Sequence, residues 1–201
     1  MINLIPRFYD VTQGRILLDG IDIREVQQSD LREKIGFVPQ KGTLFSGTIE
    51  SNLLYADPEA SHETIQEALE IAQATDFVFE SEDGLDSDIS QGGTNVSGGQ
   101  KQRLSIARAL VKKPPIYIFD DSFSALDFKT DSTLRRELKK KTGESTVLIV
   151  TQRVATVKNA DQIIVLEEGK VVGKGTHKEL MGTCETYQEI ASSQLSKEEL
   201  A

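Results

Sequence analysis

Apolar runs alternate with amphipathic segments along most of this chain. Residues 116–120 (IYIFD) and 145–151 (STVLIVT) are nearly continuous apolar runs, which is typical of strands that are covered on both faces. Apolar positions recur at helical spacing in about 97–111 and 128–141, one segment before the first run and one between the two. Strands that alternate with helices predict an α/β protein with a parallel sheet at its centre.

The rest of the chain predicts smaller elements and one long connection. Asp19-Gly20 is flanked by β-forming residues, which favours a tight hairpin turn. Gly, Ser and Asp are concentrated in 81–95, which predicts an irregular connection of the kind that is often functional. The other expected elements are a hairpin at 15–23, a strand at 34–40 that Pro39 ends, a helix at 61–79 after a serine cap, a hairpin at 161–175, and two short helices after it.

Composition narrows the classes of function. A chain of 201 residues is long enough for one globular domain, and its 23 basic and 32 acidic residues give a net charge of -9. This charge opposes sequence-independent binding to nucleic acid or to an anionic membrane surface. No apolar stretch approaches the roughly 20 residues of a membrane-spanning helix, and no signal-peptide pattern is visible, so we expect a cytoplasmic protein. The single cysteine, Cys184, is expected to be a small, partly buried hydrophobe.

Two adjacent carboxylates end the first apolar run. Asp120 and Asp121 stand where the sequence predicts the carboxyl end of a buried strand. In doubly wound sheets, ligands bind outside these strand ends, so the pair is a candidate site. Acidic residues that cap a following helix occur at the same place, and the two carboxylates alone do not separate these interpretations.

The segment NVSGGQKQRLSIARAL at 95–110 predicts a helix whose start could bind an anion. Ser97 is placed as the N-cap, and Gln100 three residues later completes a capping-box pattern. Gly98 and Gly99 leave the first backbone amides open to close approach, and such helix starts bind phosphate well. The same four residues, 97–100, would also be found in a glycine turn that caps the helix well and binds no ligand.

The motifs that follow one another in this chain resemble those of ATP-binding cassette (ABC) ATPase domains. VSGGQKQRLSIARAL resembles the signature motif, the strand that ends at Asp120 resembles the Walker B strand, and SALD, which ends at Asp127, resembles the D-loop. FVPQKGTLFSGTIESNL resembles the Q-loop, with Gln40 as its glutamine, and LIVTQRVATV resembles the switch segment. The resemblance covers essentially the whole chain and is strongest to the exporter branch.

This resemblance implies an ABC-type P-loop NTPase fold, incomplete at the N-terminus. It implies a single partial domain over 1–201, with a helical subdomain at about 41–112 and the catalytic core strands and C-terminal part at about 113–201. Two such domains sandwich two ATP molecules head to tail. The implied partners are therefore a second ABC ATPase domain and the transmembrane domain of an exporter, which would be contacted through 42–80 at the cytoplasmic face of the membrane, and no nucleic acid.

The resemblance also implies roles for single residues. Asp120 would hold Mg²⁺ through its water shell, and Gln40 would approach the ion and the attacking water. Asp127 would communicate across the dimer. Four residues of the signature helix start would bind the partner's ATP: Ser97, Gly98, Gly99 and Gln100.

Two departures from the family pattern are expected to weaken hydrolysis. Asp121 stands where competent members carry a glutamate that polarises the attacking water, and its carboxylate is one methylene short. Gln152 stands at the position of the switch histidine, and an amide cannot become an imidazolium. Together these changes resemble the degenerate half of a heterodimeric exporter. An ordinary surface glutamine at a strand end is the other interpretation of Gln152.

A third departure is the phosphate loop, since no G-x-x-x-x-G-K-[ST] occurs in the 201 residues. We therefore expect no useful ATP affinity of this chain alone. The strand that precedes the loop in the family is also missing, and since its neighbours would be left uncovered, we expect marginal stability. Two interpretations remain. The chain is either the ATPase portion of an exporter subunit, or a non-enzymatic remnant or interaction module that supplies its signature helix in trans. Whether it is an enzyme therefore stays open. A soluble ABC-type ATPase of DNA repair is a weaker alternative, because the heptads of a coiled coil are missing.

Overall fold

The computed structural model describes residues 1–195. The chain divides into two compact units, Met1–Val150 and Thr151–Ala201, which are described separately below.

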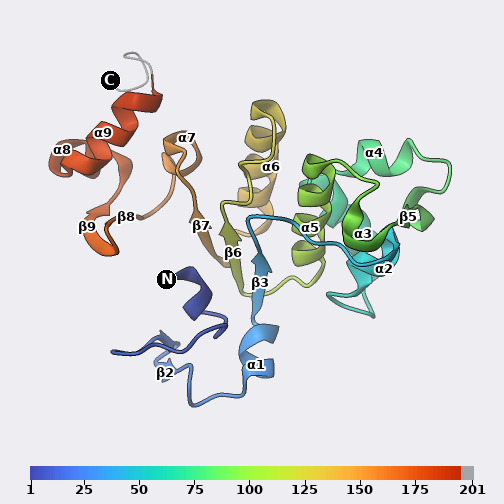
Figure 1. The fold of residues 1–201 in the computed structure, drawn as a ribbon, viewed down its shortest axis with the longest axis horizontal. Helices are drawn as coiled ribbons and strands as arrows, with labels where there is room; N and C mark the ends of the chain where they lie inside the picture. The colour runs from blue at the N-terminus through green and yellow to red at the C-terminus, as the bar shows by residue number, and fades with distance from the viewer. Residues whose placement is uncertain (196–201) are drawn as a thin grey trace. The chain divides into compact units, whose positions relative to one another are not determined.

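The first unit is built around a parallel sheet of three strands. These are β3 (Ile35–Val38), β6 (Ile116–Asp120) and β7 (Thr146–Val150), with β6 in the middle (Figure 1). The parallel sheet predicted from the apolar runs is thus confirmed. The prediction that β7 is covered on both faces holds only in part, because Val147 and Ile149 pack against one apolar cluster and Leu148 against another, whereas Val150 is 41% exposed.

Two 14-residue helices flank β6 in the chain, α5 (Gly98–Val111) and α6 (Phe128–Lys141), and both were expected. The capping box that starts α5 is present, since the hydroxyl of Ser97 accepts from the amide of Gln100 and the Gln100 side chain accepts from the amide of Ser97. The apolar face of α5 packs against β3 and against two earlier helices, α2 (Ile49–Leu54) and α3 (His62–Ile71). These contacts place the start of α5 near the carboxyl end of the sheet (Figure 1).

The single helix expected at 61–79 is two helices, α3 and α4 (Thr75–Phe79). The break is a Schellman motif, in which the amides of Gln73 and Ala74 donate back to carbonyls in the last turn of α3. Gln73 takes the left-handed conformation there, with φ of 56°. Glycine usually occupies this position, so the sequence carried no sign of the break.

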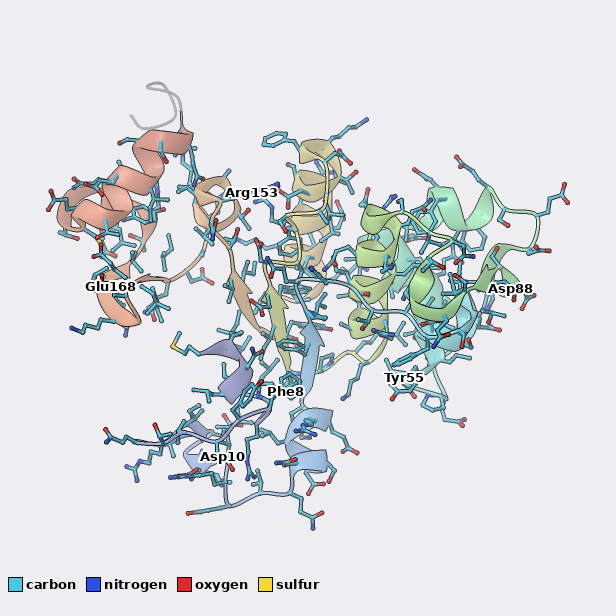
Figure 2. The ribbon with its side chains drawn as sticks, viewed as in Figure 1. Phe8, Asp10, Tyr55, Asp88, Arg153 and Glu168 are labelled. Carbon is cyan, nitrogen blue, oxygen red and sulfur yellow. The ribbon has the colours of Figure 1, made fainter. Side chains whose placement is uncertain are left out.

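The irregular connection at 81–95 contains more structure than expected. It forms two 3-10 turns, η2 (Gly84–Asp86) and η3 (Gln91–Gly93), and between them β5 (Asp88–Ile89). This two-residue strand pairs with β4 (Gly47–Thr48), some forty residues earlier in the chain. Asp88, labelled in Figure 2, pairs with Thr48 in this short ladder.

The N-terminal part of the unit contains short elements. The hairpin expected around Asp19-Gly20 is confirmed. The elements are η1 (Ile2–Leu4), β1 (Leu17–Leu18), β2 (Ile21–Asp22) and α1 (Gln28–Glu33).

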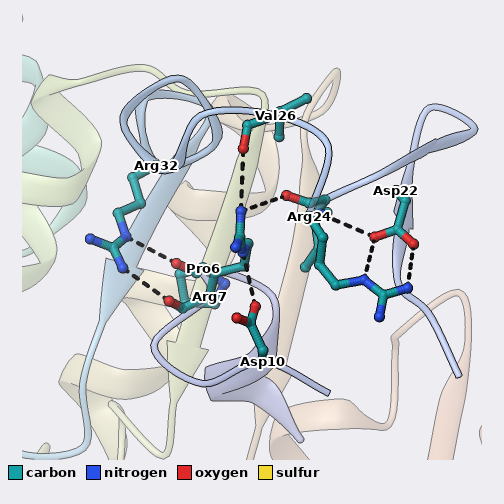
Figure 3. Close-up of polar contacts among 8 residues, drawn as sticks. Pro6, Arg7, Asp10, Asp22, Arg24, Val26 and Arg32 are labelled. Carbon is teal, nitrogen blue, oxygen red and sulfur yellow. Dashed lines mark hydrogen bonds and ion pairs between the residues drawn. The ribbon is translucent and has the colours of Figure 1, made fainter. Parts of the chain in front are cut away.

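Arginine side chains hold this part together by donating to backbone carbonyls (Figure 3). Nη1 of Arg7 donates to the carbonyls of Ile23 (3.1 Å) and Val26 (3.2 Å). Arg32 donates through Nε to the carbonyl of Pro6 (3.0 Å) and lies over the ring of Phe8. The first ten residues, which lack a long helix or strand of their own, are therefore fixed through side-chain donors.

We expect Arg7→Ala to destabilise the protein by about 2 kcal/mol, because two partly buried carbonyls lose their donor. Thermal unfolding followed by circular dichroism should show a midpoint lower by roughly 4–8 °C. Arg24→Ala is the matched control. Arg24 pairs with Asp22 at 2.7 Å on the surface, where its hydrogen bonds lower the pKa of Asp22 to about 2. An equal loss from both substitutions would contradict the importance of the carbonyl contacts.

The described part of the second unit, residues 151–195, contains a hairpin and three short helices. The expected hairpin and the two helices after it are confirmed, whereas the first helix was not expected. The core of this unit contains Cys184, which is 5% exposed, and Tyr187, whose hydroxyl lies 2.9 Å from Nδ1 of the partly exposed His177. Burial lowers the pKa of His177. The elements are α7 (Val154–Val157), β8 (Ile163–Glu167), β9 (Lys170–Gly175), α8 (His177–Thr183) and α9 (Glu185–Gln194).

Across residues 1–195, every helix is too short or too polar to span a lipid bilayer.

Candidate functional site

The carboxyl ends of β3 and β6 bring two candidate site residues into contact. Nε2 of Gln40, two residues after β3, donates to Oδ2 of Asp121 at 3.0 Å. The amide of Asp121 donates to the carbonyl of Val150 at the end of β7 (2.9 Å), so the aspartate is fixed between two strands. Its φ is 46°, a left-handed conformation that aspartate tolerates better than most residues do. The two residues are 81 positions apart in sequence, and the parallel register of the sheet joins them.

Asp120 is the last residue of β6 and is partly exposed at the same edge of the sheet. Its carboxylate and that of Asp121 are hard oxygen ligands of the type that Mg²⁺ prefers, and Mg²⁺ commonly takes only one or two carboxylates and keeps several waters. No cluster of three or more His, Cys, Asp or Glu that could hold a metal is found within residues 1–195. The donors present therefore fit a hydrated Mg²⁺ rather than a fully protein-enclosed metal.

The start of α5 is open as the sequence predicted. Ser97 and Gly98 are exposed, and a Cβ built on Gly98 meets no atom within 4 Å. Gly99 lies against the turn after β6, since a Cβ there would come 3.6 Å from the carbonyl oxygen of Ala125. The capping box uses both Oε1 of Gln100 and its backbone amide, so the amides left open to a ligand are those of Gly98 and Gly99. The free donors at this helix start are thus backbone amides, which favour an anion.

Asp127 has a structural partner that the sequence did not indicate. Its Oδ1 accepts from the amide of Thr130 at 3.0 Å and caps α6. Hydrogen bonding to Thr130 also lowers the pKa of Asp127, so its carboxylate stays charged. The residue lies on the surface next to the turn that carries Asp121.

Gln152 belongs to the second unit, and its side chain is exposed. Its carbonyl accepts from Nε2 of Gln194 at 2.7 Å, which ties the start of the unit to α9.

Two buried polar side chains at the site escaped the sequence analysis. Ser122 and Gln102 are 0% and 2% exposed, and both bond to the backbone around the end of β3. The signal for Gln102 was its place on the apolar stripe of α5, three residues before Ser105 and four before Ile106. A buried polar residue on such a stripe needs a hydrogen-bond partner, and this requirement is the signal that singles out Gln102.

Comparison with known proteins identifies the family. The family model described as ABC transporter matches residues 1–124, which is more than half of the chain. The chain belongs to the ABC transporter family. The ATP-binding domains of this family generally use ATP and Mg²⁺.

Curated relatives give the same assignment. This ABC transporter chain is 48% identical over 197 residues to an uncharacterized ABC transporter ATP-binding protein of Mycobacterium tuberculosis. It is 44% identical over 194 residues to an ATP-binding/permease protein of Staphylococcus aureus whose name proposes multidrug export. Each alignment covers 96% of this chain and 34% of the relative, so the chain spans about a third of the length of these proteins.

A solved structure supports the fold. The chain superposes on the structure of a bacterial Atm1-family ABC exporter with ATP bound, with a TM-score of 0.93 and 37% identity. The match covers 97% of this chain and 34% of the exporter chain. The expected ABC-type α/β fold is thus confirmed.

Proposed function

We propose that this chain is the ATP-binding portion of a membrane exporter and that the start of α5 binds ATP held by a second ABC domain. The observation that carries the proposal is the capped helix start after Ser97, where Gly98 is exposed and the backbone amides of Gly98 and Gly99 are open to a phosphate. The relatives of this chain that combine ATP-binding and permease parts support coupling to transport through a transmembrane partner.

Within this proposal, the edge formed by β3 and β6 is the hydrolytic part of the domain. Asp120 is placed to hold a hydrated Mg²⁺, and the Gln40 amide to orient a water. Asp121 would act as the base, but its short side chain is engaged by Gln40. Because a positioned base contributes about 10²- to 10⁴-fold, we infer weak hydrolysis and a heterodimeric arrangement in which a partner supplies the competent site.

A second candidate function is that of a module that binds no nucleotide alone. It is favoured because the 201 residues contain no phosphate loop, whose amides and lysine hold the β- and γ-phosphates in P-loop NTPases. Such a chain would lend α5 to another ABC domain in trans, with exchangeable partners rather than one exporter.

Calorimetric titration with MgATP tests the nucleotide part of the proposal. We expect no binding in the micromolar range by the chain alone. In a mixture with an ABC domain that has a complete phosphate loop and a disabled catalytic base, we expect ATP to drive association of the two chains in sedimentation velocity.

Micromolar binding of ATP by the chain alone would refute the first expectation. Failure to associate with an ABC domain that pairs with itself under the same conditions would refute the role of α5. Association with several unrelated ABC domains at equal affinity would favour the module over the dedicated exporter subunit.

A further inference from the structure

We propose that Gln102 is a positioning residue that holds the Gln40 loop against Asp121 and links this contact to helix α5. Its importance for hydrolysis rests on the function proposed above, whereas the positioning itself is a property of this chain alone. Nothing in the signature pattern of the sequence assigns a task to Gln102, which is five residues beyond the N-cap of α5.

Gln102 clamps the loop from both sides. Its Nε2 donates to the carbonyl of Pro39 at 3.1 Å, and its Oε1 accepts from the amide of Gly42 at 2.8 Å. The two backbone groups stand immediately before and after Gln40 and Lys41. One buried amide thus satisfies one acceptor and one donor and sets the span of the loop that carries Gln40.

The backbone of Gly42 lies directly on α5. A Cβ at this position would come 2.7 Å from Oγ of Ser105 and 3.0 Å from both Oε1 of Gln102 and the carbonyl of Lys101. Such contacts are shorter than van der Waals separations, so the loop can approach the helix this closely only with glycine. The clamp therefore acts at close range and leaves the loop little freedom relative to α5.

The other side of the Gln40–Asp121 contact is fixed independently. The hydroxyl of Ser122, next to Asp121, donates to the carbonyl of Val38 at 2.8 Å and is fully buried. This bond joins the turn after β6 to the end of β3. Gln40 then extends between two anchored points, the strand end at Val38 and the clamp at Gly42, and its amide reaches Asp121 from there.

The clamp links the start of α5 to the Gln40–Asp121 contact. Gln102 lies on the same continuous helix as the exposed helix start, so a displacement of α5 would move the Gln40 loop and change the distance between Gln40 and Asp121. An error of about 1 Å in such a position can cost roughly 100-fold in rate.

A chemical-shift double-mutant cycle on the isotope-labelled chain tests this proposal without nucleotide. Asp121→Asn should shift the side-chain amide signals of Gln40 in the otherwise unchanged protein. In a Gln102→Met background, which keeps the volume and removes both hydrogen bonds, we expect this shift to fall by about half or more. Gly42→Ala, which pushes the loop away while Gln102 is intact, should have the same effect.

Asn52→Leu is the matched control. Asn52 is another buried amide that bonds to both backbone groups of one residue, Phe45, at 2.8 and 2.9 Å, beyond the Gln40 loop. It should lower the melting temperature but retain the full shift. Should the shift persist in both Gln102→Met and Gly42→Ala, or be absent in the unchanged protein, the proposal is overturned. Either result leaves the nucleotide titrations, and hence the proposed function, unaffected.

Discussion

Replacing Asp121 by Glu is expected to raise ATP hydrolysis about 10- to 100-fold, because the longer side chain brings a carboxylate within reach of the attacking water. The measurement needs a chimera in which the phosphate loop of a relative, with the strand before it, precedes Met1, paired with an ABC domain whose own base is disabled. Release of phosphate is then measured at saturating MgATP.

The same substitution should cost some stability. Asp121 has a φ of 46°, and a left-handed backbone costs ordinary residues roughly 1 kcal/mol that aspartate and asparagine partly avoid. We therefore expect Asp121→Glu to lower the melting temperature slightly while activity rises. Asp121→Asn, which keeps the shape and loses the charge, is the control and should hydrolyse no faster than the unchanged chimera. A rate for Asp121→Glu equal to that of the unchanged chimera would show that another residue limits the reaction.

Gly98→Asp is expected to weaken ATP-driven pairing about 100-fold or more. It places a carboxylate where the γ-phosphate would approach the start of α5, and two like charges about 4 Å apart repel by about 4 kcal/mol at an intermediate dielectric. The fold should tolerate the change, since there is open space around the site and an acidic residue in the first turn stabilises a helix. Sedimentation velocity at increasing partner concentration measures the loss.

Gly143→Asp is the matched control for Gly98→Asp. Gly143 is exposed in the turn after α6, so the substitution adds the same charge away from the helix start. It should leave pairing unchanged. Equal weakening by both substitutions would mean that net charge, rather than a phosphate at α5, controls association.

The sequence predicted the elements whose signals are local. The start of α5 was predicted because Ser97 and Gln100 form a capping box whose parts are three residues apart, and β6 because its apolar run is uninterrupted. The coverage of β7 was predicted only in part, since an apolar run indicates apolar neighbours but not how far they cover the ends of the strand.

What the sequence could not show depends on distant or atypical contacts. The pairing of β4 with β5 involves two residues on each side and no long pattern. The break at Gln73 uses a residue that rarely takes a left-handed conformation. The clamp between Gln102 and Gly42 joins positions 60 residues apart. Taken alone, a glutamine on a helix or a glycine in a loop is common and indicates no contact between them.

The burial of Cys184 has a practical value for these measurements. It is the only thiol in the chain and packs in the second unit so tightly that a Cβ on Gly173 would come 2.7 Å from its sulfur. A maleimide dye should therefore react slowly with the unchanged protein, since an enclosed thiol is poorly accessible. A cysteine introduced at an exposed position would be the principal attachment point, so distances between paired domains become accessible by fluorescence without first removing a native thiol.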